Sequence, residues 1–133
     1  MRFLLDTHTF LWFVGGDARL SAGARPLILD PASERLLSTA SLWEMAIKTS
    51  LGRLTLTFPF AERVERQVLG NAIEVLPVLP AHLDRLVRLP FHHKDPFDRL
   101  ILAQAIAENV PVVSRDADFG LYDVDVLWDE PAG

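Results

Sequence analysis

The chain has 133 residues, of which 50% are hydrophobic and 23% charged, so it fits one globular domain and not a disordered segment. It contains no cysteine, which excludes disulfide scaffolds, thiolate zinc sites and cysteine nucleophiles. Charged residues occur too early in the chain for a signal peptide, and no apolar run reaches the ~18 residues of a membrane span. We therefore expect one domain over residues 1–133, located in the cytoplasm, with no membrane partner.

The formal net charge of −5 argues at first against a nucleic-acid partner. Six of the 18 acidic residues, however, lie between Asp116 and the C-terminus, where there is no Lys or Arg. The rest of the chain holds 13 basic and 12 acidic residues. If several of those acids bind a cation, the remaining surface becomes basic. The total charge therefore does not decide whether the chain binds nucleic acid.

Short apolar runs alternate with helical patterns along the whole chain. In chain order we predict a strand at 1–5, helices at 9–14 and 21–29, a strand at 36–38, helices at 41–51 and 60–69, a strand at 73–76, helices at 81–89 and 96–108, and strands at 111–114 and 124–128. This alternation predicts an α/β fold, with a doubly wound, mostly parallel five-stranded sheet and helices on both faces. In such sheets ligands bind beyond the carboxyl ends of the strands.

Acidic residues recur where this topology brings the ends of the strands together. Asp6 directly follows the first strand, Glu44 lies in the helix after the second, and Asp116 comes just after the fourth. Asp95 and Asp98 begin the helix at 96–108. Acids from separate elements repel each other unless a cation neutralises them, and oxygen ligands without cysteine suit Mg²⁺ or Mn²⁺ better than zinc.

Each acid also has a local interpretation. Ser41 and Glu44 match a capping box at the start of a helix, Asp95 matches an N-cap followed by proline, and Asp116 can hold an Asx turn. Asp6 is harder to explain locally. A carboxylate that closes an apolar strand is partly buried, and no basic residue follows nearby to pair with it.

At these residues the sequence resembles the PIN-domain family, specifically the VapC type of bacterial toxin. The matching segments are LLDTH at 4–8, SLWEMAIK at 41–48, HKDPFDRL at 93–100 and VSRD at 113–116. The resemblance implies a PIN-like fold and a divalent-metal endoribonuclease that acts as the toxin of a toxin–antitoxin pair. It also implies a cognate antitoxin as partner and, usually, a homodimer.

The resemblance further implies a set of site residues. Asp6, Glu44, Asp98 and Asp116 match the acidic quartet, Asp95 is an additional candidate metal ligand, and Thr7 and Ser114 are accessory candidates. We hypothesise that Asp6 and Asp98 hold the principal Mg²⁺ or Mn²⁺ ion, while the other two acids complete the site directly or through water. Water activated there would attack the scissile phosphate and leave a 5′-phosphate and a 3′-hydroxyl.

Basic residues around these segments are candidates for contacts to RNA phosphates, although a solvated surface is the alternative for any single one. They are Lys48, His92, His93, Lys94, Arg99 and Arg115. Trp12 and Trp43 lie in apolar helices, which favours a place in the core, while Leu11, Trp12 and Phe13 are a possible groove for an antitoxin helix.

Other functions stay open at this point. A non-catalytic RNA- or protein-binding module with the same fold is the main alternative, and metal binding distinguishes it from a nuclease. An aspartyl phosphotransferase with Asp6 as nucleophile requires a second Asp two residues later, where this chain has His8. A DNase would share the chemistry, so the preference for RNA comes from the resemblance.

Overall fold

A computed structural model describes residues 1–55 and 58–128 of the chain. Five strands form one sheet: β1 (Arg2–Leu5), β2 (Glu34–Ser38), β3 (Glu74–Leu76), β4 (Val112–Val113) and β5 (Val126–Leu127). Their order is β3-β2-β1-β4-β5, and every neighbouring pair is parallel. The predicted five-stranded sheet is confirmed, and it is parallel throughout. Because the strand order reverses beside β1, the carboxyl ends of β1 and β4 flank the topological switch point.

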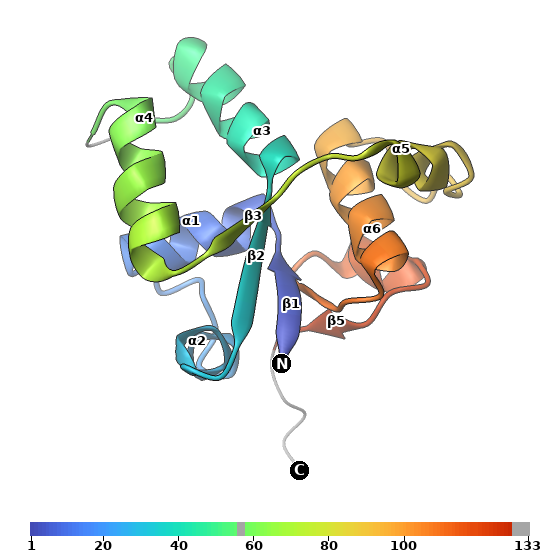
Figure 1. Ribbon diagram of the computed structural model, residues 1–133, viewed down its shortest axis with the longest axis horizontal. Helices are drawn as coiled ribbons and strands as arrows, with labels where there is room; N and C mark the ends of the chain where they lie inside the picture. Colours follow the sequence, from blue (N-terminus) through green and yellow to red (C-terminus); the bar gives the residue numbers. More distant parts are fainter. Residues whose placement is uncertain (56–57, 129–133) are drawn as a thin grey trace.

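Helices cover both faces of the sheet, as predicted. They are α1 (Thr7–Gly15), α2 (Ala24–Leu29), α3 (Thr39–Ser50), α4 (Phe60–Arg63), α5 (Pro80–Val87) and α6 (Pro96–Glu108), with a π-helical turn η1 (Val64–Val68) and 3₁₀ turns η2 (Leu69–Asn71) and η3 (Ala117–Leu121). Figure 1 shows α1, α2 and α4 on one side of the strands and α5 and α6 on the other, with α3 rising beyond the end of β2. No helix among the described residues has the length and apolar character to cross a membrane.

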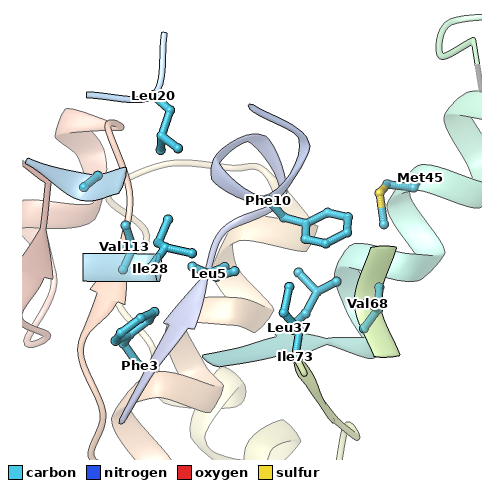
Figure 2. Packing of buried hydrophobic residues seen from close by; sticks show 11 residues of the cluster. Phe3, Leu5, Phe10, Leu20, Ile28, Leu37, Met45, Val68, Ile73 and Val113 are labelled. Atoms are coloured by element: carbon cyan, nitrogen blue, oxygen red, sulfur yellow. The ribbon is translucent and has the colours of Figure 1, made fainter. Parts of the chain in front are cut away.

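Alternate residues of the strands enter two separate hydrophobic clusters, one on each face of the sheet. Phe3 and Leu5 pack with Phe10, Leu37 and other residues of the first cluster (Figure 2), which lies beneath α1, α2 and α3. Leu4 belongs to the second cluster, which the residues of α5 and α6 complete. The central strand is therefore buried on both sides, which explains its unbroken apolar run.

Four predicted helices differ from the structure at their ends. The helix predicted at 21–29 spans Ala24–Leu29 and the one predicted at 81–89 spans Pro80–Val87, while the other two begin earlier for a local reason. The helix predicted at 41–51 begins at Thr39, because the Ser38 hydroxyl at the end of β2 already accepts the N–H of Ala40 at 2.9 Å. The capping box proposed for Ser41 and Glu44 is therefore ruled out. The helix predicted at 9–14 likewise begins earlier, at Thr7, because Asp6 is its N-cap.

The amphipathic segment predicted as one helix at 60–69 has mixed helical geometry. Only its first four residues are α-helical, and the chain then continues through the π-helical turn η1 and the 3₁₀ turn η2. The helix predicted at 96–108 is confirmed with the same bounds.

Candidate functional site

The carboxyl ends of β1 and β4 carry two polar residues that are joined by a short hydrogen bond. The hydroxyl of Ser114 donates to Oδ2 of Asp6 at 2.5 Å and accepts the backbone N–H of Asp116 at 3.0 Å. Both Asp6 and Ser114 are buried. Ser114, an accessory candidate in the sequence, therefore links the first and last acids of the predicted quartet.

The second carboxylate oxygen of Asp6 caps the helix that follows it. Oδ1 accepts the backbone N–H of Thr9 at 2.7 Å, so both oxygens of Asp6 have fixed donors. Burial raises the pKa of Asp6, and the hydrogen bonds from Ser114 and Thr9 oppose this rise. The carboxyl group is thus held in one orientation at the switch point.

Glu44 is buried and reaches the site from α3. Its Oε1 accepts the hydroxyl of Thr7 at 2.8 Å, and its Oε2 accepts the ammonium of Lys48 at 2.6 Å. The hydroxyl of Ser41 lies 2.8 Å from that of Thr7 and extends this network. A buried carboxylate is tolerated where it has such partners. Thr7, the other accessory candidate, thus positions Glu44 and helps to connect α1 with α3.

Asp95 and Asp98 occupy the first turn of α6. Oδ1 of Asp95 accepts the backbone N–H groups of Phe97 at 2.9 Å and Asp98 at 3.0 Å, which confirms Asp95 as the N-cap. Asp95 is exposed, whereas the side chain of Asp98 keeps only 22% of its accessible surface. Asp98 therefore faces inward, towards the sheet end, while Asp95 stabilises the helix start.

Electrostatics ties the predicted acids together. Burial, and to a smaller extent the negative charges of Asp95, Asp6, Glu44 and Asp116, raise the pKa of Asp98 to about 8. Charges act on the pKa of a neighbouring carboxyl group only over short distances, so these four carboxylates lie near Asp98. The structure therefore brings the quartet and Asp95 into one acidic group.

The acidic group does not form a closed metal cage. Within residues 1–55 and 58–128, no three His, Asp or Glu side chains stand close enough together to enclose an ion. The donors are carboxylate and hydroxyl oxygens, and burial and neighbouring negative charge both disfavour an ionised Asp98, a penalty that a cation would offset. Mg²⁺ typically keeps several waters and takes one or two carboxylates from the protein. The residues fit a divalent ion held in that open manner.

An open pocket of about 270 Å³ adjoins two members of the acidic group, Asp6 and Asp116. It is lined by Asp6, His8, Trp12, Arg115 and Asp116. The imidazole of His8 stacks on the indole of Trp12, with 5.9 Å between ring centroids, and the guanidinium of Arg115 lies 6.0 Å from that indole. The pocket is therefore lined by two carboxylates, two aromatic rings and one guanidinium.

A second pocket of about 320 Å³ shares His8 and Trp12 with the first. Its lining also includes Lys48, Arg53 and Arg63, so positive charge continues away from the acidic group. A larger pocket of about 410 Å³ lies at the amino ends of β4 and β5, and no member of the acidic group lines it. We assign the site by its chemistry and its position on the sheet, because the size of a pocket alone does not indicate catalysis.

The six basic residues predicted near RNA have different surroundings, and the side chain of His93 is only 10% exposed. Arg115 and Lys48 line the two pockets, and His92 and Lys94 are exposed beside α6. Arg99 is different, because it is buried and its guanidinium donates to the carbonyls of Leu89 and Pro90. The prediction that Arg99 contacts RNA is therefore wrong.

Two aromatic positions also differ from the sequence expectation or were missed by it. Trp43 is 61% exposed, and its ring meets that of Phe97 edge-on at 5.4 Å, so its predicted place in the core is wrong. Tyr122 is buried, and its hydroxyl lies 2.8 Å from Nδ1 of His93. No local pattern identifies Tyr122, because its partners lie about 30 residues earlier in the chain.

Two substitutions of Asp95 distinguish the effect of its N-cap hydrogen bonds from the effect of its negative charge. We expect Asp95→Ala to lower the free energy of unfolding by about 1 kcal/mol, because the N–H groups of Phe97 and Asp98 lose their acceptor. Asp95→Asn retains an N-cap oxygen, so it should unfold at nearly the urea concentration of the wild type. Equal destabilisation by both substitutions would show that the negative charge, and not the cap, stabilises this helix.

The fold and the site define a doubly wound parallel α/β domain with carboxylates gathered at its switch point. A sequence model described as the PIN domain matches residues 3–125. The chain therefore belongs to the PIN-domain family, as the sequence resemblance indicated.

Solved structures share this fold at low sequence identity. The structure of VapBC2 from Rickettsia felis, bound to a DNA fragment from its promoter, aligns with a TM-score of 0.71 at 15% identity, over 97% of this chain and 100% of that one. VapBC-5 from Mycobacterium tuberculosis, a member of the VapBC family of toxin-antitoxin systems, aligns with a TM-score of 0.62 at 21% identity. The alignment covers 96% of this chain and 98% of that one. FitAcB from Neisseria gonorrhoeae aligns with a TM-score of 0.62 at 20% identity, over 96% of each chain. No curated protein sequence gave a match.

Proposed function

We propose that this PIN-domain protein is an Mg²⁺- or Mn²⁺-dependent endoribonuclease and the toxin of a toxin–antitoxin pair. The observation that carries the proposal is the shared acidic group, in which Asp98 is affected by four other carboxylates at the switch point of the sheet. Membership of the PIN-domain family supports it, and so do structural neighbours that are toxin–antitoxin complexes.

Each part of the site has a separate task in this proposal. Asp6 and Asp98 would hold the ion, with Glu44 and Asp116 completing its surroundings directly or through water. Ser114 keeps Asp6 in place, and Thr7 does the same for Glu44. A divalent cation at this position supplies neutralising charge for a phosphodiester and lowers the pKa of nearby water.

The two adjoining pockets supply a path for a polynucleotide. The aromatic wall of His8 and Trp12 offers a face on which a base can stack, and Arg115, Lys48 and Arg53 offer positive charge to phosphates. Because a cation at the acidic group would remove the local repulsion, the net charge of −5 does not oppose binding of RNA.

We also propose a cognate antitoxin as partner, a homodimer and a cytoplasmic location. The structural neighbours include complexes of toxin with antitoxin, which supports the first of these. Leu11, Trp12 and Phe13 lie on α1 and are partly exposed, so they remain candidates for an antitoxin groove. Val87 and Phe91 are more than four-fifths exposed and provide apolar surface for a contact between subunits.

The proposal is tested by cleavage of a labelled structured RNA in Mn²⁺ or in EDTA. Wild-type protein should cleave only with Mn²⁺, and Asp6→Asn should reduce cleavage by more than about 100-fold, since even outer-shell partners of a metal are worth ~10–100-fold. Asp30→Asn is the matched control, because Asp30 is exposed and lies just before the amino end of β2.

Three results separate the candidate functions. Cleavage that needs Mn²⁺ and is lost only in Asp6→Asn supports the nuclease. Equal cleavage by all three proteins indicates a contaminating enzyme and gives the proposal no support. Absence of cleavage, together with no rise of Tm in Mn²⁺, contradicts the proposal and favours a non-catalytic binding module with a PIN fold.

A further inference from the structure

Asp98 is partly buried, and it lacks the fixed donors that the buried carboxylates Asp6 and Glu44 have. Asp6 accepts from Ser114 and Thr9, and Glu44 accepts from Thr7 and Lys48. Within the described part of the chain, no side chain donates to the Asp98 carboxylate at hydrogen-bond distance. The nearest candidate is Nε2 of His93, which lies 3.8 Å from Oδ2.

Aromatic packing holds the largely buried ring of His93 beside Asp98. Its side chain is 10% exposed, and its ring lies against those of Phe119 and Tyr122, with centroids 6.1 and 5.4 Å away. Nε2 is buried and has no hydrogen-bond partner among the described residues. A buried ring nitrogen without a hydrogen-bond partner lowers the stability of the fold, unless a nearby group of the site forms a hydrogen bond with it.

The hydroxyl of Tyr122 determines which ring nitrogen of His93 carries the proton. Its oxygen accepts the backbone N–H groups of His92 at 3.1 Å and His93 at 3.2 Å, with Nη1 of Arg99 at 3.5 Å. A phenol has two acceptor lone pairs and one hydrogen, so with both lone pairs occupied its hydrogen is left for Nδ1 of His93, 2.8 Å away. A neutral ring that accepts at Nδ1 carries its own proton on Nε2.

We propose that His93 is a positioning residue for Asp98: Tyr122 fixes the imidazole as the Nε2–H tautomer, and this N–H orients the Asp98 carboxylate within the acidic group. The role rests on the proposed function, because Asp98 is assigned there to hold the cation. It gives Asp98 the fixed donor that Ser114 gives Asp6 and Thr7 gives Glu44. At 3.8 Å the two atoms are beyond hydrogen-bond distance, so the Asp98 carboxylate must turn towards Nε2 for this N–H to reach it.

Two substitutions separate the two ends of the imidazole. His93→Asn retains a polar group near the position of Nδ1, which faces Tyr122, but has nothing at the position of Nε2. His93→Gln places an amide N–H close to the position of Nε2. We expect His93→Asn to weaken Mn²⁺ binding by about 10–100-fold, and His93→Gln to recover most of that loss.

The measurement is titration of full-length protein with Mn²⁺, followed by electron paramagnetic resonance of the free ion. The Tm of each metal-free variant is measured beside it. Asp30→Asn is the control, because Asp30 is exposed and lies just before the amino end of β2. Nitrogen-15 NMR of metal-free wild type should show His93 protonated on Nε2 and bare on Nδ1.

The outcomes distinguish this inference from the proposed function. Weak binding in His93→Asn, recovery in His93→Gln and unchanged metal-free Tm values support the positioning role. Unchanged Mn²⁺ affinity in His93→Asn, or a proton on Nδ1 in the NMR spectrum, overturns that role while wild-type Mn²⁺ binding leaves the proposed function intact. Failure of wild-type protein to bind Mn²⁺ overturns the proposed function and the positioning role with it.

Discussion

Asp98→Asn is expected to make the metal-free protein more stable near pH 8 while it removes stabilisation by Mn²⁺. The pKa of Asp98 is about 8 in the folded protein and 3.8 is its ordinary value. Between these values the folded chain binds a proton that the unfolded chain releases. The free energy of unfolding of the metal-free wild type should therefore fall as pH rises from about 4 to about 8.

Asparagine is neutral at every pH in this window, so the free energy of unfolding of the variant does not fall in this way as pH rises. Solvent reaches part of the Asp98 side chain, and we therefore expect only about 1–2 kcal/mol at pH 8 and not the full value that the pKa would imply. In a domain of this size this amounts to a rise of a few degrees in Tm. The measurement is thermal unfolding in EDTA at pH 5, 6, 7 and 8, where the gap between variant and wild type should widen with pH.

The same substitution removes a carboxylate that is assigned to hold the cation. A ligand at 100 times its Kd stabilises a folded protein by about 2.7 kcal/mol, so wild type should gain several degrees in Mn²⁺ and Asp98→Asn should not. Cleavage of RNA should fall by more than about 100-fold. Asp118→Asn is the control, because Asp118 is exposed in η3 and outside the quartet. A gap in Tm that does not change with pH would contradict the shared acidic group.

The sequence was sufficient to predict the parallel sheet and the positions of acids at its edge, because both follow from the order of residues within short segments. Asp6 ends a buried strand and Asp116 follows another, so parallel topology alone brings them to one edge. Asp95 was correctly predicted as an N-cap from the proline that follows it. Glu44 was given a capping role in the local interpretation, because the sequence does not show that Ser38 of the preceding strand already caps the helix.

Contacts between distant parts of the chain could not be predicted. The bond from Ser114 to Asp6 joins residues 108 positions apart, and Tyr122 contacts His93 across 29 positions. A local signal was also overlooked, because Glu44 and Lys48 stand four residues apart on a helix and form an ion pair. Burial is equally non-local, which explains why Arg99 was expected at the surface and Trp43 in the core.

The second large effect is expected at Arg99, which joins the loop after α5 to the first turn of α6. Its guanidinium donates to the carbonyls of Pro90 at 2.7 Å and Leu89 at 3.1 Å. It also lies 3.8 Å from the ring centroid of Phe91 and within 3.5 Å of the Tyr122 hydroxyl. The loop that carries His93 to the acidic group therefore depends on one buried cation.

Arg99→Ala is expected to lower the free energy of unfolding by about 3–5 kcal/mol, because the carbonyls of Leu89 and Pro90 lose their donor inside the protein. Lys94→Ala should change it by less than about 0.5 kcal/mol, since Lys94 is exposed. Urea unfolding at constant pH measures both values. A cation that contacts phosphates behaves in the opposite way: its removal leaves stability unchanged and reduces the salt dependence of RNA binding. If Arg99→Ala unfolds like the wild type and loses salt-dependent RNA binding, Arg99 belongs to the RNA path, and the loop must be held by Tyr122 alone.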